Sequence, residues 1–165
     1  MDQKNFNEVL GKLMLAVFMV GLLIGAMMYL NGRWSKIRDM RRLVDSRNII
    51  KALQIFYMQY GDYPDGVVDD ANGWDNSNDA GQGSFLKTVV DNGVLSGQPF
   101  DPKNDQDYYY RYQRFPAGAF GCLRPFAVFQ VMRFEKESFE LGAGECAKMD
   151  FTKLAPLGYT WQDFE

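Results

Sequence analysis

Residues Leu13 to Leu30 read LMLAVFMVGLLIGAMMYL, eighteen consecutive residues without a charged side chain. A helix of about 20 apolar residues is long enough to cross the hydrocarbon core of a membrane, which is about 30 Å thick. Tyr29 and Trp34 stand where aromatic side chains gather at a membrane surface. The stretch therefore predicts a transmembrane helix within residues 1–31 of the chain.

Two other structures would give a similar apolar stretch. A cleaved secretory signal peptide has a shorter apolar region and a cleavage site with small residues, and no such site follows Leu30. A buried core helix would need a larger protein around it. A retained membrane anchor therefore fits the sequence best.

A pair of glycines, Gly21 and Gly25, lies four residues apart on one face of this predicted helix. Such a G-x-x-x-G step lets the backbone of a second helix approach closely. Glycine is also generally frequent in membrane helices, so one pair alone is a weak signal. Gly21 and Gly25 are the candidate helix-packing residues.

The helix is expected to continue past Asn31-Gly32, where it could bend. From there on its apolar and charged residues alternate as in an amphipathic helix. We expect residues 32–61 to lie against a globular domain. Gly61 stands where a left-handed helix cap is expected, and Pro64 follows it. The pattern predicts one helix from about Val9 to Tyr60. Its apolar residues recur mostly every three or four positions: Trp34, Ile37, Met40, Val44, Ile50, Leu53, Phe56 and Tyr60, with Arg33, Lys36, Arg38, Arg41, Arg42, Arg47 and Lys51 between them.

Residues 62–165 are predicted to form a globular head that is not mainly helical. Ser84 is a candidate N-cap for a short helix through Asn92, closed by Gly93. A long N-terminal helix packed on a small antiparallel β-sheet makes an α+β fold. Polar residues 135–137 are expected to join the last two of its three predicted strands as a hairpin. Three stretches rich in Tyr, Phe and Val are the strand candidates: Tyr108–Gln113, Phe126–Phe134 and Ser138–Leu141.

The two cysteines flank this predicted hairpin, because Cys122 precedes its first strand and Cys146 follows its second. Both fall at its open end, within plausible bridging reach, so we expect a disulfide between them. Two unrelated buried thiols are the alternative. A bridge would add about 3 kcal/mol in the chain-entropy model and would imply an oxidising compartment.

Composition and charge narrow the classes of function. The chain has no histidine, which excludes His-based catalysis and the commonest metal ligand. Residues 1–60 carry nine Lys/Arg against four Asp/Glu, a net charge of +5, whereas residues 61–165 carry nine against seventeen, a net charge of −8. Such an acidic head disfavours nucleic acid as a partner. We expect neither an enzyme nor a nucleic-acid-binding protein.

The many aspartates of the head leave two lesser alternatives. Paired carboxylates can hydrolyse glycosides without histidine, but most of these aspartates lie in Gly/Asn/Pro-rich stretches where aspartate is the ordinary turn residue. Asp75-x-Ser77-x-Asp79 resembles the start of a calcium loop, yet Ala80 and Leu86 replace the glycine and glutamate of an EF-hand. We expect no catalytic residue and no cofactor, with a calcium ion in the head as a minor possibility.

Aromatic residues of the head form a further candidate site. They could make a platform for a glycan or another partner, although half-buried strand positions explain them more simply. The residues are Trp74, Tyr108, Tyr109, Tyr110, Tyr112 and Trp161.

Taken together, these features resemble the type IV pilin and type II secretion pseudopilin family over nearly the whole chain. The most specific part is ALQIFYMQYGDYP, Ala52 to Pro64, which looks like the end of the long helix in major pseudopilins. Gly73-Trp74-Asp75, residues 85–95, and Phe100-Asp101-Pro102-Lys103-Asn104 followed by Tyr108-Tyr109-Tyr110 also look like the family's head. The resemblance implies a hydrophobic helix that packs in a filament core and a disulfide-pinned head outside the membrane.

The resemblance does not extend to the leader of prepilins. That leader ends in glycine, followed by a hydrophobic or aromatic residue and, soon after, by a glutamate in the apolar helix. Here Lys12 follows Gly11, Glu8 precedes the apolar stretch, and Leu13–Leu30 contains no glutamate. The chain therefore offers no recognisable motif for leader cleavage of the family's kind.

The orientation of the head receives opposing signals. Lys4 and Lys12 precede the span, whereas six Lys/Arg residues follow it between Arg33 and Arg47, and the positive-inside rule would then place the head in the cytoplasm. The cysteine pair and the family resemblance place it outside. We favour the outside, because a basic helix can instead contact anionic lipid or the acidic heads of neighbouring subunits.

The expected function is therefore structural. We expect a single-pass protein of the inner membrane with an extracytoplasmic head. It would associate through its N-terminal helix with itself and with other pilin-like subunits, in a pilus, a pseudopilus or a related envelope assembly. The alternative is a membrane-anchored binding module that displays its head and does not polymerise.

Overall fold

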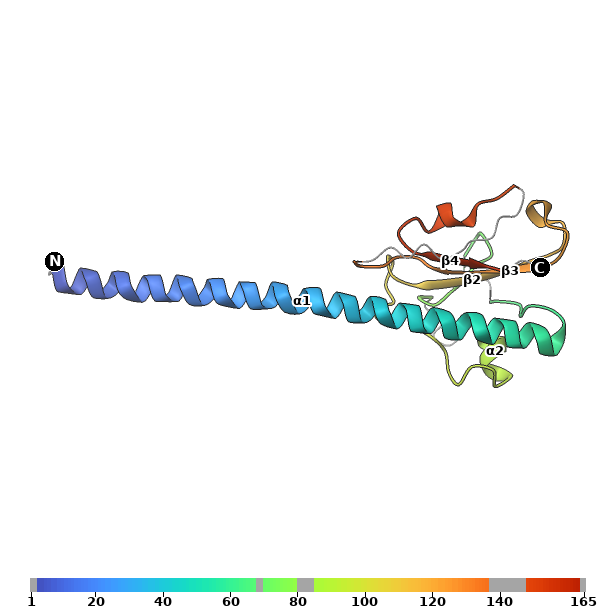
Figure 1. The fold of residues 1–165 in the computed structure, drawn as a ribbon, viewed down its shortest axis with the longest axis horizontal. Coiled ribbons are helices and arrows are strands. Elements are labelled where there is room, and N and C mark those ends of the chain that lie inside the picture. The colour runs from blue at the N-terminus through green and yellow to red at the C-terminus, as the bar shows by residue number, and fades with distance from the viewer. Residues whose placement is uncertain (1–2, 68–69, 80–84, 137–147, 164–165) are drawn as a thin grey trace. The chain divides into compact units, whose positions relative to one another are not determined.

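The computed structural model describes residues 3–67, 70–79, 85–136 and 148–163. The chain divides into two units, Met1–Ile37 and Arg38–Glu165. Helix α1 (Gln3–Tyr60) is helical through Asn31-Gly32 without a break (Figure 1). The remaining elements all belong to the second unit: β1 (Asp75–Asn76), α2 (Lys87–Asp91), β2 (Tyr110–Phe115), the 3-10 helix η1 (Ala119–Gly121), β3 (Phe126–Val131), the 3-10 helix η2 (Phe151–Leu154) and β4 (Tyr159–Gln162).

The predicted end of the long helix is confirmed. Gly61 has a φ of 77°, and its N–H donates to the carbonyl of Tyr57 at 2.8 Å, which closes the last turn of α1. Glycine adopts this left-handed conformation without steric cost. The helix begins at Gln3, earlier than the predicted Val9.

The four strands form one antiparallel sheet in the order β1-β2-β3-β4, which confirms the α+β class. The first predicted strand begins two residues too early, since β2 starts at Tyr110, and the second is too long, since β3 ends at Val131. Neither β1 nor β4 was predicted. β1 has only two residues, and β4 is a four-residue strand whose sequence, YTWQ, lies close to the C-terminus.

The sequence predicted that Phe126–Phe134 pairs with Ser138–Leu141 in a hairpin. This prediction is wrong, because β3 has other strands on both of its sides. β3 lies between β2 and β4, and Val128 to Val131 pair with Tyr159–Gln162 on that side. Ser138–Leu141 lies outside the described residues. The predicted N-cap of the short helix is also wrong: α2 begins after Leu86, and Ser84 is outside the described residues.

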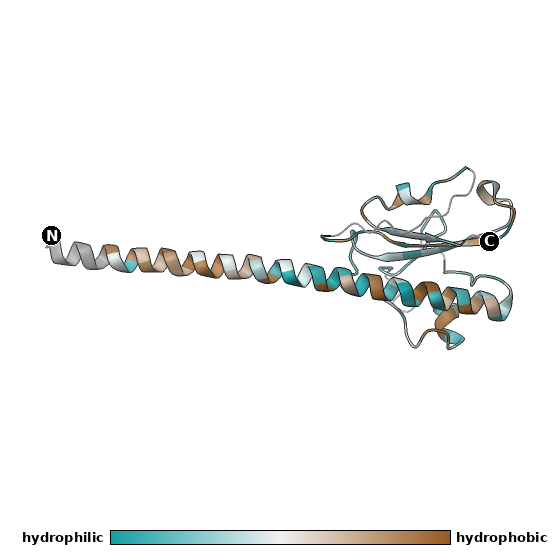
Figure 2. Ribbon diagram, in the orientation of Figure 1, coloured by the Kyte–Doolittle hydropathy of each residue, from teal (hydrophilic) through white to brown (hydrophobic). Residues whose placement is uncertain are grey.

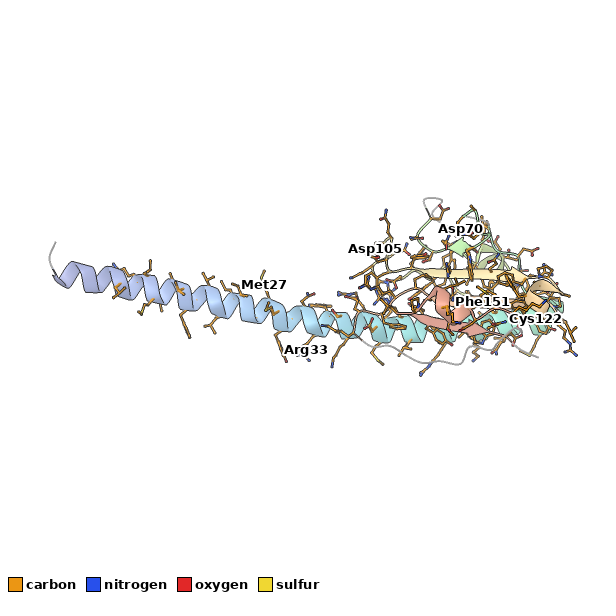
Figure 3. All side chains as sticks on the ribbon, turned by 90° about the horizontal axis from the view of Figure 1, so that it is seen from above. Met27, Arg33, Asp70, Asp105, Cys122 and Phe151 are labelled. Carbon is orange, nitrogen blue, oxygen red and sulfur yellow. The ribbon has the colours of Figure 1, made fainter. Side chains whose placement is uncertain are left out.

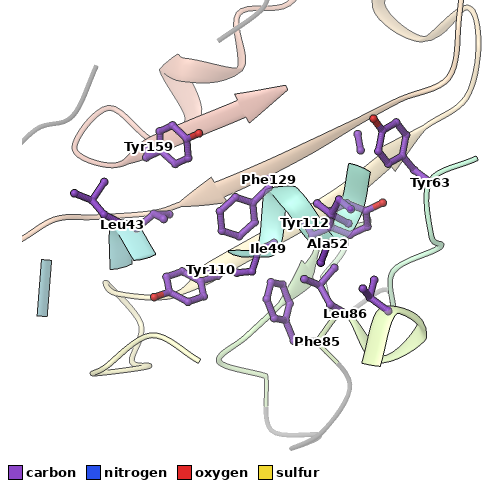
Figure 4. Packing of buried hydrophobic residues seen from close by; sticks show 14 of the residues in the cluster. Leu43, Ile49, Ala52, Tyr63, Phe85, Leu86, Tyr110, Tyr112, Phe129 and Tyr159 are labelled. Carbon is purple, nitrogen blue, oxygen red and sulfur yellow. The ribbon is translucent and has the colours of Figure 1, made fainter. Parts of the chain in front are cut away.

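The sheet is covered on both faces, and every residue of β3 is buried. Alternate β3 side chains therefore point into two separate apolar clusters. The larger cluster lies between the sheet and α1 (Figure 4); it includes Leu43, Ile49, Leu53, Tyr110, Tyr112, Phe129 and Val131. The smaller cluster, on the other face, consists of Trp74, Phe115, Phe126, Val128 and Phe151.

The face that α1 turns toward the sheet differs from the predicted apolar stripe. Leu53 and Phe56 are buried as expected, but Met40 and Val44 are 57 % and 50 % exposed. Trp34 and Ile37, in the first unit, are also exposed. In the first turns of α1 in the second unit, Leu43 is buried, but the other buried positions are polar: Asp39, Arg42 and Ser46.

Candidate functional site

The first candidate site is the apolar part of α1 in the first unit. Its large side chains from Leu13 to Leu30 are all more than half exposed, up to 74 % for Met27 and Met28. Among the described residues, α1 is the one helix long and apolar enough to cross a membrane. Figure 2 shows the hydrophobic colouring of this stretch, and Figure 3 shows Met27 projecting from the helix. So much exposed apolar surface is unfavourable in water, so it needs lipid or protein around it.

The predicted packing residues Gly21 and Gly25 lie on this exposed surface. A Cβ atom built on either glycine would meet nothing within 4 Å. No contact within the first unit therefore requires a glycine at either position. The geometry leaves room for the backbone of another helix, and helix packing at these glycines stays a prediction.

The second candidate site is a buried ion cluster in the second unit, composed of Arg38, Asp39, Arg42, Asp101, Lys103 and Glu135. At its centre Arg42 is fully buried. Its Nε and Nη2 atoms donate to the two carboxylate oxygens of Asp101 at 2.6 and 2.9 Å, and Nη1 donates to Asp39 at 2.7 Å. Two-pronged bonds of this kind are the strongest that arginine makes.

Glu135 forms the outer side of the ion cluster. Its carboxylate accepts two hydrogen bonds from Arg38, both at 2.6 Å, and lies 3.2 Å from Arg42 and 3.3 Å from Lys103. These partners, Arg38 first, lower the pKa of Glu135 to about 2, although burial opposes the shift. Burial alone would lower the pKa of Arg42, but its bonds to the carboxylates outweigh burial and raise it. Glu135 and Arg42 therefore both stay charged at neutral pH.

Asp39 and Tyr108 make further contacts in the ion cluster. The carboxylate of Asp39 accepts backbone N–H bonds from Glu135 and Lys136, both at 2.9 Å. The ring of Tyr108 lies under Arg42 and Lys103, at 4.9 and 3.9 Å from the ring centre. The cluster thus ties one turn of α1 to two distant segments of the head, near Asp101 and near Glu135.

This cluster was not predicted from the sequence, because Arg38 and Arg42 were counted among the basic residues of an amphipathic helix that contacts lipid or neighbouring heads. Two of the three acidic side chains that balance the basic ones, Asp101 and Glu135, lie far away in the sequence, so the local charge of this stretch reads as basic. The spacing of Asp39 and Arg42, three residues apart on one helix face, was the available signal. It does not reveal the distant partners.

The six candidate aromatic residues do not form one exposed platform, although Tyr108, Tyr109 and Trp161 are partly exposed. Tyr110 and Tyr112 are fully buried, and Trp74 is 4 % exposed, so these three rings belong to the core, as half-buried strand positions suggested. Their polar atoms are used within the head. The Tyr110 hydroxyl donates to Asp45 at 3.0 Å, and the Tyr112 hydroxyl donates to the carbonyl of Pro64 at 2.7 Å.

The aspartates considered for catalysis or calcium mostly stabilise turns. Asp70 accepts bonds from the N–H groups of Asn72 and Trp74, and Asp105 from those of Asp107 and Tyr108. The described side chains contain no group of three or more acidic or cysteine ligands that could hold a metal ion. Asp69, another aspartate of the head, lies outside the described residues.

Asp75 and Ser77 of the calcium-like stretch have structural partners in the described part of the chain. Asp75 is buried and accepts the N–H of Leu86 at 3.0 Å. The Ser77 hydroxyl donates to Asn104 at 2.8 Å and accepts the N–H of Tyr110. These bonds attach β1 to the turn that precedes β2 and to the start of α2.

The predicted disulfide remains a prediction. Cys122 follows η1 and packs beside the smaller apolar cluster (Figure 3). Cys146 lies outside the described residues. The hairpin from which the bridge was inferred is not the pairing that β3 makes. Cys122 is nevertheless disulfide-bonded and not a free thiol, and its pairing with Cys146 stays a prediction.

Comparison with protein-family models, curated proteins and solved structures found no match in any of the three.

Proposed function

We propose that this chain is a pilin-like structural subunit that is anchored in a membrane and self-associates through the first part of α1. The observation that carries the proposal is α1 itself. One helix presents eighteen residues of exposed, uncharged apolar surface and then becomes the packing partner of an α+β head. This combination is what the resemblance to pilins and pseudopilins implies.

Membrane anchoring alone would not require glycines at positions 21 and 25. Lipid tails are as apolar as leucine side chains, so helices in a membrane associate mainly where small residues allow close contact. The open surface at Gly21 and Gly25 meets this condition. It therefore supports a second helix, rather than lipid alone, as the neighbour of this face.

An extracytoplasmic head in the inner membrane is part of the proposal. It is supported by the family resemblance and by the cysteine pair, Cys122 and Cys146, which would form a bridge only in an oxidising compartment. The basic residues after the span argue for the opposite orientation. They need another role if the proposal is correct.

The test compares Gly21→Ile with Ala16→Ile in the full chain, expressed in a bacterial host. Both changes add the same side chain to the span, but position 16 faces away from Gly21 and Gly25 at 100° per residue. We expect all three chains to fractionate with membranes. Chemical cross-linking in intact cells should join copies of the wild type and of Ala16→Ile, and cross-linking of Gly21→Ile should fall at least about tenfold.

Two results would contradict the proposal. A wild-type chain that enters membranes but never cross-links to itself would favour the displayed, non-polymerising module. A chain that stays out of the membrane fraction would remove the anchor altogether.

A further inference from the structure

Two cations follow the apolar stretch of α1 within the first unit, and the sequence around them offers no acidic partner. Arg33 and Lys36 are exposed and lie three residues apart, on one face of the helix. No ion pair or hydrogen bond joins either side chain to another described residue. The chain has no Asp or Glu from Val9 to Ile37. Arg33 and Lys36 are called the basic pair.

Three cations that follow soon after the basic pair already have carboxylate partners. Arg38 and Arg42 belong to the ion cluster, and Arg41 lies 3.7 Å from Asp45. Asp39, the first acidic residue after the span, is bound by Arg42 and by two backbone N–H groups. The basic pair is therefore not part of this charge network, and its anion has to come from outside the described chain.

The position of the basic pair along α1 matches the depth of lipid phosphate groups. The eighteen apolar residues that end at Leu30 rise about 27 Å as a helix, close to the thickness of the hydrocarbon core, which is about 30 Å. The polar headgroup layer adds about 5–7 Å on each side. Arg33 and Lys36, three and six residues beyond Leu30, lie about 4.5 and 9 Å further along the helix. Figure 3 shows Arg33 on α1 a short way past Met27.

Helix geometry turns both side chains back toward the span. Each Cα–Cβ bond of an α-helix tilts toward the N-terminus. The guanidinium carbon of Arg33 lies 5.7 Å from the centre of the Tyr29 ring, one turn nearer the span, so this side chain does lean that way. The ring attracts the cation and holds it at the level where the apolar surface ends. The N–H groups of the guanidinium have no hydrogen-bond partner in the described chain.

We infer that Arg33 and Lys36 bind the phosphate group of an anionic phospholipid at the membrane surface, an inference that rests on the membrane anchor of the proposed function. Arginine binds phosphate with several N–H groups at once, and lysine adds a compact positive charge. Like charges one turn apart repel each other, and a phosphate between them offsets this repulsion. Trp34, 58 % exposed, suits the same layer. The inference gives the basic pair a role that does not require a cytoplasmic head.

An anionic lipid fits the basic pair better than an acidic head of a second copy does. The phosphate layer begins where the apolar stretch ends, so it surrounds this turn of α1 in every anchored chain, whether or not the chain is assembled. A neighbouring head would need a carboxylate at this same level. Continuity with the apolar span therefore favours lipid.

The same helix offers a matched control for charge. Arg47 and Lys51 are exposed and, like the basic pair, have no ion pair with a described residue. Arg47 is fourteen residues beyond Arg33, which is about 21 Å along the helix and more than the thickness of the headgroup layer. Removing these two charges changes the net charge of α1 equally but leaves the basic pair intact.

The experiment measures which lipid surrounds Trp34 in the full chain, reconstituted in phosphatidylcholine vesicles that contain a minor fraction of phosphatidylglycerol. Bromine atoms on the acyl chains of one lipid or the other quench the fluorescence of a tryptophan that they contact. The chain has three tryptophans, and a Trp34→Phe chain gives the signal of the other two, which is subtracted. The test variant is Arg33→Gln with Lys36→Gln.

We expect phosphatidylglycerol to be preferred over phosphatidylcholine around Trp34 at least about fivefold in the wild type and in the control, Arg47→Gln with Lys51→Gln. In the test variant the preference should fall below about twofold, because the uncharged amides no longer attract the phosphate. All chains should give the same near-ultraviolet circular dichroism, since the four substituted side chains are exposed. Inorganic phosphate, added at constant ionic strength, should leave the preference unchanged.

Four outcomes would overturn the inference while the membrane anchor stands. The first is equal quenching by the two brominated lipids in the wild type. The second is a preference that falls equally in the control, which would show attraction to the basic helix as a whole. The third is a preference that inorganic phosphate abolishes, which would show a site for a free anion. The fourth is weaker self-cross-linking of the test variant with an unchanged lipid preference, which would assign the basic pair to a neighbouring copy.

A different result would remove the proposed function itself. If neither brominated lipid quenches Trp34, the chain does not enter the membrane, and the anchor on which both proposals depend is wrong.

Discussion

In the first unit α1 leaves its apolar side chains exposed, whereas in the second unit the same helix buries charged ones. Met27 is 74 % exposed, and Arg42, fifteen residues later, is fully buried. Figure 2 shows the corresponding change along the helix from hydrophobic to mixed colouring. Exposed apolar surface is costly in water, and a buried charge is costly unless an opposite charge pairs with it.

The difference shows that each half of α1 depends on a different kind of partner. The apolar half needs surroundings that the described part of the chain does not provide, which is why a membrane and other helices enter the proposal. The charged half finds its partners within the head, in Asp101 and Glu135. The comparison can be tested by removing the partners of each half separately.

The largest effect is expected from Arg42→Met in the ion cluster. Methionine fills similar space but leaves Asp101 and Asp39 buried without their cation, which typically costs about 3–5 kcal/mol. The matched control is Arg41→Met, whose side chain is 65 % exposed and should cost less than about 1 kcal/mol. Unfolding of the full chain in detergent, followed by near-ultraviolet circular dichroism, measures both.

If Arg42→Met were as stable as Arg41→Met, the conclusion that the second half of α1 depends on buried ion pairs would be wrong. This result would mean that the buried carboxylates find other partners, and that the head does not depend on charge pairing with α1.

A second test uses the same substitution in both halves of the helix. Leu53 is fully buried against the sheet, so Leu53→Ala should destabilise the head by about 2–5 kcal/mol. Leu23 is 64 % exposed, so Leu23→Ala should change the unfolding of the head by no more than about 0.5 kcal/mol. Equal effects in the same unfolding assay would show that the first unit contributes to the fold of the second.

The sequence predicted well those features that depend on local patterns. The end of α1 at Tyr60 followed from Gly61 and Pro64, and β3 was located because Phe126–Val131 is an unbroken β-forming stretch. The apolar span was evident from composition alone. Each of these signals lies within a few neighbouring residues.

The features that the sequence analysis missed depend on contacts between distant residues. Met40 and Val44 have the helical spacing of core residues, yet the segments facing this turn carry Asp101 and Glu135, so Arg42 is buried there instead. β4 has only four residues and pairs with a strand about thirty positions earlier. No local period indicates such partners.

The smallest effect, and the one most specific to charge, is expected from Glu135→Gln. A glutamate whose pKa falls from 4.5 when unfolded to about 2 when folded binds fewer protons in the folded state. It therefore contributes stability that is fully present above about pH 5.5 and is lost as the pH falls through 4.5 toward 2.

Glutamine resembles the protonated acid and cannot make the charged bonds to Arg38. Wild type and Glu135→Gln should therefore differ by about 1.5–3 kcal/mol in the free energy of unfolding at neutral pH. The difference should shrink between pH 4.5 and 2, as Glu135 in the wild type becomes protonated. Asp45, whose pKa burial raises, contributes the opposite slope equally in both chains and cancels from the difference. A difference that stays constant across this range would mean that Glu135 stabilises the head by its shape and not by its charge, and the contrast between the two halves of α1 would then be one of packing alone.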